Sequence, residues 1–120
     1  MKRFIFLESG LFKASQNLSE VITTNASRTL DSSDINNFLL CENTANIILT
    51  IPNNVNIPVN SEINITQDST GKVTISPESG VSLSGDGRSN QSFTLLNQYA
   101  LATLKKVSST SWRIYGALEW

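Results

Sequence analysis

The sequence predicts an all-β protein, a small β-sandwich or open barrel of about seven to nine short antiparallel strands with an extended N-terminal arm. Three observations support this fold class. From Phe38 onward, apolar and polar residues alternate with a period of two, which is typical of strands with one buried and one solvated face. Serine, threonine and asparagine make up 41 of the 120 residues, and these residue types favour turns. The length suits one domain with one core.

Residues 1–28 are predicted to form a docking arm, and residues 29–120 the β-domain. The arm holds two apolar clusters but no sustained helical spacing, so it has no obvious core of its own. Lys2 and Arg3 imitate the start of a signal peptide, but Glu8 ends the apolar run that follows them after four residues. An export signal needs about 7–15 such residues and a membrane helix about 20, so we expect neither.

The elements that begin the β-domain follow from capping residues and apolar runs. One helical turn is expected within 31–37, where several residues can act as N-caps, and it leads into a strand at 38–41. The run 47–51 is apolar enough on both faces to be a central strand. Pro52 then ends this strand.

The clearest hairpin prediction joins a strand with Ile63 and Ile65 to a strand with Val73 and Ile75, through turn residues at 68–71. An exposed loop is expected at 85–92, which contains no apolar residue. The remaining strands are expected around 81–83, 93–96, 102–107 and 112–118.

A weak internal echo relates residues 49–57 to residues 73–83, since both read as a strand, a proline-containing corner and a short strand. A solenoid usually needs at least about three stacked units. We therefore interpret the echo as recurrent strand-turn geometry.

The composition excludes several classes of function. The formal net charge is −1 and only 16% of the residues are charged, which disfavours nucleic acid and acidic membranes as partners. Histidine is absent and Cys41 is the one cysteine, so a zinc site, an intrachain disulfide and histidine-based catalysis are not expected. Cys41 lies in an apolar strand and is predicted to be a small buried hydrophobe. We expect no cofactor, no metal and no catalytic residues.

Short motifs between residues 30 and 118 resemble a module that is common in bacteriophage and prophage tail and virion proteins. The motifs are Thr-Leu-Asp-Ser-Ser-Asp at 29–34, Asn-Thr-Ala-Asn-Ile-Ile-Leu-Thr-Ile-Pro at 43–52, Ile-Pro-Val-Asn-Ser-Glu-Ile-Asn-Ile at 57–65, Gly-Lys-Val-Thr-Ile at 71–75, Gly-Val at 80–81, Tyr-Ala-Leu-Ala-Thr-Leu-Lys-Lys-Val at 99–107 and Ser-Trp-Arg-Ile-Tyr-Gly-Ala-Leu at 111–118. Asn60 stands where the module often has glycine, and residues 1–28 lie outside the pattern. The resemblance implies a compact, non-enzymatic virion building block, often a homotrimer and often attached through an N-terminal segment.

The expected function is therefore that of a phage virion structural protein, a decoration, cement or fibre-anchoring subunit. It would assemble with itself, with a trimer as the stoichiometry that the resemblance implies, and dock on a capsid or tail protein through residues 1–28. Its expected location is the virion, assembled in the host cytoplasm. The alternative is a receptor-binding tail module that recognises a host-surface glycan, and the third hypothesis is a glycan-active enzyme.

Large apolar side chains identify the candidate assembly interface. Trp112 is predicted to be buried, because it is in phase with Ile114 and Leu118, whereas Tyr115 points the other way. Trp120 ends the chain, and we expect a neighbouring chain to cover it. The residues predicted for the assembly interface are Phe4, Phe6, Leu11, Phe12 and Trp120, and those for the alternative ligand site are Arg88 and Tyr115.

Two sharper chemical hypotheses rest on acidic residues. Asp68, Glu78 or Asp86 could form a carboxylate pair for glycoside hydrolysis, but all three lie in segments where turn chemistry explains them. The loop with Asp86 and Asn90 could hold calcium, but it has too few carboxylates for such a site. An ordinary loop is the favoured interpretation of both segments.

Overall fold

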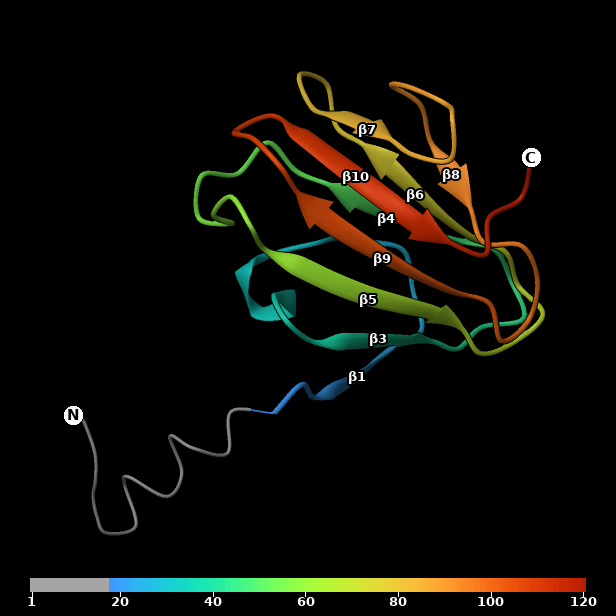
Figure 1. The fold of residues 1–120 in the computed structure, drawn as a ribbon. Helices are drawn as coiled ribbons and strands as arrows, with labels where there is room; N and C mark the ends of the chain where they lie inside the picture. The colour runs from blue at the N-terminus through green and yellow to red at the C-terminus, as the bar shows by residue number, and fades with distance from the viewer. Residues whose placement is uncertain (1–17) are drawn as a thin grey trace, which may run out of the picture.

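The computed structural model describes residues 18–120, which form a sandwich of two β-sheets (Figure 1). The six-stranded sheet has the order β1-β3-β5-β9-β10-β7, and the four-stranded sheet has the order β2-β4-β6-β8. The all-β sandwich is thus confirmed, with ten strands. The strands are β1 (Val21–Thr24), β2 (Arg28–Thr29), β3 (Phe38–Cys41), β4 (Ile47–Ile51), β5 (Glu62–Gln67), β6 (Val73–Pro77), β7 (Ser82–Ser84), β8 (Phe93–Thr94), β9 (Leu101–Lys106) and β10 (Ser111–Gly116).

The chain alternates between the two sheets from β1 to β9. As a result β1, β3 and β5 pair in parallel in one sheet, and β2, β4 and β6 pair in parallel in the other. The prediction of antiparallel strands holds for only three pairings, β5–β9, β9–β10 and β6–β8. Strands β1 to β6 therefore form a short two-sheet solenoid. The β9–β10 hairpin adds two strands to its six-stranded sheet.

The hairpin predicted at 68–71 is wrong, because this turn carries the chain from one sheet to the other. It joins β5 to β6, and these strands belong to different sheets. Ile63, Ile65, Val73 and Ile75 are all buried, so both strands do face the core as expected. The alternation reports which face is buried, but it is the same for a hairpin and for two strands that face each other across a core.

The two segments of the internal echo lie side by side in two stacked coils of this solenoid, but Leu49 pairs with Ile75 and not with Val73, as the echo aligned it. Phe38 pairs with Asn64 in one sheet and Ile47 with Val73 in the other, so the coils are offset by 26 residues in both sheets. The turns stack as well: a Cβ on Gly71 would lie 2.1 Å from the carbonyl oxygen of Ala45, which leaves room only for glycine. The coil formed by β1 and β2 precedes these two.

The turn before β3 forms as predicted. Ser32–Asp34 is a 3-10 helix, and a capping box closes its N-terminus. The backbone N–H of Ser33 donates to the Asp31 carboxylate at 2.9 Å, and the backbone N–H of Asp31 donates to the Asp34 carboxylate at 2.9 Å.

The core lies between the two sheets and includes Trp112, with 1% of its surface exposed, as predicted. Each sheet contributes alternate residues of its strands. The largest fully buried side chains are Trp112, Phe93, Leu30, Leu39, Leu49, Ile51, Ile57, Ile63, Ile65, Ile75, Leu83 and Leu95.

The predicted arm overlaps the sandwich at its C-terminal end. β1 lies within residues 1–28 and pairs with β3, and Arg28 pairs with Leu49 of β4. The guanidinium of Arg28 also donates two hydrogen bonds to the buried Asp34 carboxylate, at 2.8 and 2.7 Å. Residues 21–28 therefore take part in both sheets, whereas the docking role of the segment before them stays a prediction.

Candidate interaction surface

The outer face of the six-stranded sheet carries a group of apolar side chains that point away from the core. Strand alternation directs them outward, since their neighbours in sequence face the core. The group comprises Val21, Phe38, Leu40, Leu101 and Tyr115, which we call the outer apolar face. Val21, Leu101 and Tyr115 are 64%, 53% and 55% exposed, and the other two are half-buried.

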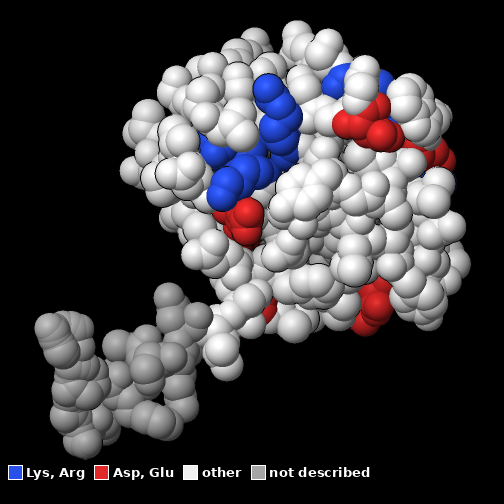
Figure 2. All heavy atoms as spheres, viewed as in Figure 1, with Lys and Arg blue, Asp and Glu red and all other residues white. Residues whose placement is uncertain are grey.

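A charged row borders the outer apolar face. Glu62 of β5 pairs with Lys105 of β9, and Lys105 pairs with Arg113 of β10. The Lys105 ammonium lies 3.4 Å from the Glu62 carboxylate. In Figure 2, with β3, β5, β9 and β10 toward the viewer, Lys and Arg atoms gather at one side of this face next to acidic atoms, and much of the remaining face is uncharged.

A polar pair lies in the middle of the face. The hydroxyl of Thr103 on β9 donates to the Asn64 side-chain oxygen on β5 at 2.6 Å. These two residues belong to one row across five strands, with Val21 and Phe38 on one side of them and Tyr115 on the other.

The opposite face of the sandwich differs in character. On the four-stranded sheet, Ile48 is the one large apolar strand residue that is exposed among the described residues. Its outward neighbours are small and polar, for example Thr74 and Thr94, whose hydroxyls lie 2.9 Å apart. The two outer faces thus have different chemistry, although both sheets share one core.

Arg88 and Trp120, predicted for two different sites, lie together at the C-terminus. The guanidinium carbon of Arg88 lies 4.1 Å from the centroid of the Trp120 ring and 4.8 Å from that of Phe93. Arg88 also donates to the carbonyl oxygen of Glu119 at 2.8 Å, and the Glu119 carboxylate pairs with Lys72 at 2.6 Å. Arg88 thus holds the C-terminal residues on the sandwich.

The exposure of these two residues separates their roles. The side chain of Arg88 is only 13% exposed, so little of it is free to meet a ligand. Trp120 is 81% exposed even with Arg88 over its ring, and its coverage by a neighbouring chain stays a prediction. Phe4, Phe6, Leu11 and Phe12, the other residues of the predicted interface, lie outside the described residues.

Acidic residues are scattered through the β-domain. Asp68 directly follows β5, and Glu78 directly follows β6, a strand of five residues that spans about 16 Å. The Glu78 carboxylate accepts the backbone N–H of Asn53 at 3.2 Å, and the Asp86 carboxylate lies 3.4 Å from Arg88. Within residues 18–120, no three His, Cys, Asp or Glu side chains group as metal ligands would.

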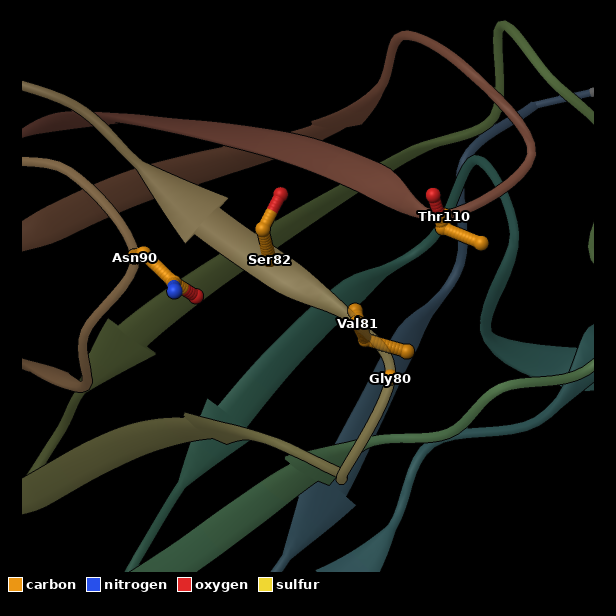
Figure 3. Close-up of a pocket in the computed structure, with 5 residues that line it drawn as sticks. All are labelled: Gly80, Val81, Ser82, Asn90 and Thr110. Atoms are coloured by element: carbon orange, nitrogen blue, oxygen red, sulfur yellow. The ribbon is translucent and has the colours of Figure 1, made fainter.

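Two further features of the described chain carry no reactive group. Cys41 is buried, and burial raises the pKa of its thiol to about 12, so the thiol stays neutral near pH 7. A hollow of about 250 Å³ opens between the turn before β7, the β9–β10 turn and the loop after β7 (Figure 3). Its lining contains no titratable side chain and consists of Gly80, Val81, Ser82, Asn90 and Thr110.

Several of these residues were not singled out from the sequence. Leu101 alternates with the buried Ala102 and Leu104, so the sequence pattern itself directs its side chain outward. The residues that lie beside Leu101 on the face depend on the strand order. Lys106 is buried, and its ammonium donates to the carbonyl oxygen of Ile57 at 2.6 Å. Two consecutive lysines in one strand were the signal for it, because one of them must face inward.

Comparison with known proteins does not assign this chain to a family. The sequence matches no protein-family model, and no curated protein shows significant similarity to it. No helix among residues 18–120 is long and apolar enough to cross a membrane.

Proposed function

We propose that this protein is a non-enzymatic structural subunit of a phage-type virion, a decoration, cement or fibre-anchoring protein. The observation that carries the proposal is the outer apolar face, which presents Val21, Leu101 and Tyr115 to solvent on one side of the sandwich only. Apolar side chains exposed in this way on one face mark protein contact sites. The resemblance of residues 30–118 to virion modules supplies the setting.

The chemistry of the described residues supports a non-enzymatic role. Asp86 and Glu78 interact with neighbouring loop residues, Cys41 is a neutral buried thiol, and Arg88 binds the C-terminal residues. These groups stabilise the fold, and none of them lines the hollow beside β7. A scaffold built this way suits an architectural subunit.

Assembly of this subunit would involve two kinds of contact. The protein associates with itself, and the stoichiometry that the resemblance implies is a homotrimer. It docks on a capsid or tail protein through the segment that precedes β1, where Phe4, Phe6, Leu11 and Phe12 supply apolar side chains. Its location is then the virion, after assembly in the host cytoplasm.

Immunogold electron microscopy tests this proposal. Antibodies against the purified full-length chain are applied to particles from a lysate of the cell that encodes it, with particles lacking the protein as the control. Label at one fixed position on the particle is expected. Protein that stays wholly in the particle-free fraction overturns the proposal.

Glycan recognition is the second candidate, because the exposed ring of Tyr115 lies in one row with the polar pair of Asn64 and Thr103. Host-cell adsorption separates the two functions. Tyr115→Ala abolishes adsorption of the purified chain to host cells at an unchanged melting temperature if this face binds a glycan, whereas a purified architectural subunit does not adsorb with or without Tyr115. Arg88→Ala tests the C-terminal contacts instead, since its guanidinium is committed to Glu119 and Trp120.

A further inference from the structure

We propose that the outer face of the six-stranded sheet binds a second copy of this chain, face to face, about a two-fold axis that runs parallel to the strands between β5 and β9. The inference rests on the self-association in the proposed function, and it gives that association a two-fold contact in place of the homotrimer that the resemblance implies. It concerns described residues alone. A two-fold contact of this kind places the same surface on both partners, so the surface must be complementary to itself.

The strand order has the symmetry that such a contact needs. The midline between β5 and β9 leaves three strands on either side, β5, β3 and β1 on one side and β9, β10 and β7 on the other. Rotation about this midline brings β5 opposite β9 of the second copy and β3 opposite β10. Aligned packing of two sheets, offset by about 30° because both are twisted, is a common geometry.

The charged row is complementary to itself under this rotation. Glu62 lies on one side of the midline, and Lys105 and Arg113 lie on the other. Glu62 of each copy therefore faces Lys105 of the other, so two pairs of opposite charges form across the interface. Within one copy, the Lys105 ammonium lies 3.4 Å from the Glu62 carboxylate. This contact is exposed, so both groups can pair with the second copy instead.

The central row is complementary in the same way. In order from β1 to β10 it reads Val21, Phe38, Asn64, Thr103 and Tyr115, and its four inner positions match one another under the rotation. The rotation places Phe38 opposite Tyr115 of the second copy and Asn64 opposite Thr103. Aromatic rings thus meet aromatic rings at the two flanks, and the hydrogen-bonding groups meet at the centre.

The four-stranded sheet does not offer a comparable surface. Its exposed strand residues are polar apart from Ile48, which is 49% exposed. A neighbouring copy would bury few apolar groups there. Ile48→Lys is therefore a matched control, since it adds the same charge to a strand on the other face.

The first experiment measures mass against concentration by light scattering for the full-length chain. The chain is expected at twice 13.1 kDa, with dissociation within about 1–100 μM. Tyr115→Lys should raise the dissociation constant about 30-fold or more, because it replaces an aromatic contact by a charge at both flanks of the interface, and Ile48→Lys should leave it unchanged. Melting temperatures verify that both variants are folded.

Charge reversal then tests the axis itself. Glu62→Lys and Lys105→Glu, each alone, place like charges opposite each other twice and should weaken the dimer. An equal mixture of the two variants places opposite charges at both positions and should restore dimer formation, with a mass near that of the wild type. The double variant, Glu62→Lys with Lys105→Glu, should also dimerise.

Four results overturn the inference: a monomer throughout the concentration range, a trimer, a dimer that Tyr115→Lys does not weaken, or a mixture that gains nothing over its components. These results are distinguishable from failure of the proposed function. Particles that carry immunogold label while the purified chain is monomeric support the virion role and refute the two-fold contact. A dimeric purified chain, together with particles that carry no immunogold label, supports the two-fold contact and refutes the virion role.

Discussion

Arg28→Ala is expected to destabilise the β-domain by about 2–4 kcal/mol, because it leaves a charged group buried without its partner. The Asp34 side chain is 1% exposed and accepts both hydrogen bonds from the Arg28 guanidinium. Removing one partner of a buried ion pair costs about 3–5 kcal/mol. The Arg28 side chain is 31% exposed, so water can reach part of the site and lower that cost.

Urea unfolding of the full-length chain at neutral pH measures this effect. A loss of this size is a large fraction of the about 5–15 kcal/mol that stabilises an ordinary domain. Lys105→Ala is the control, because the exposed pair with Glu62 should contribute less than about 1 kcal/mol. The carboxylate of Asp34 raises the pKa of Arg28, so the guanidinium is charged throughout the measurement. A loss below about 1 kcal/mol for Arg28→Ala would refute the reasoning.

Three further predictions follow from the fold. Trp112→Ala should lose about 3–5 kcal/mol in urea unfolding, whereas Tyr115→Ala should change stability by less than about 0.5 kcal/mol. Deletion of 1–17 should leave cooperative thermal unfolding, whereas deletion of 1–28 should lower the melting temperature because β1 and Arg28 are lost. Hydrogen bonds from Ser33 lower the pKa of Asp31, so Asp31→Ala should cost about 1 kcal/mol at neutral pH, and this cost should decrease as pH falls through the lowered pKa in acid titrations of stability.

The period-two alternation, which is a local property, predicted much of the sandwich. It indicated which side chains face inward, and Trp112, Ile114 and Leu118 are buried as expected. The helical turn at 32–34 was also predictable, since capping residues act on backbone groups within a few positions of themselves. These features depend on near neighbours in the chain, so the residues themselves contain the information.

Strand partners and the sites built across strands were decided by the tertiary structure. The alternation of Ile63 and Ile65 is the same whether the next strand pairs beside them or faces them across the core, and the structure adopts the second arrangement. The contact of Arg88 with Trp120 joins residues that are distant in sequence. The self-complementary order on the outer face likewise arises only when β9 pairs with β5. Such pairings are selected by burial of the whole core at once, which no single segment encodes.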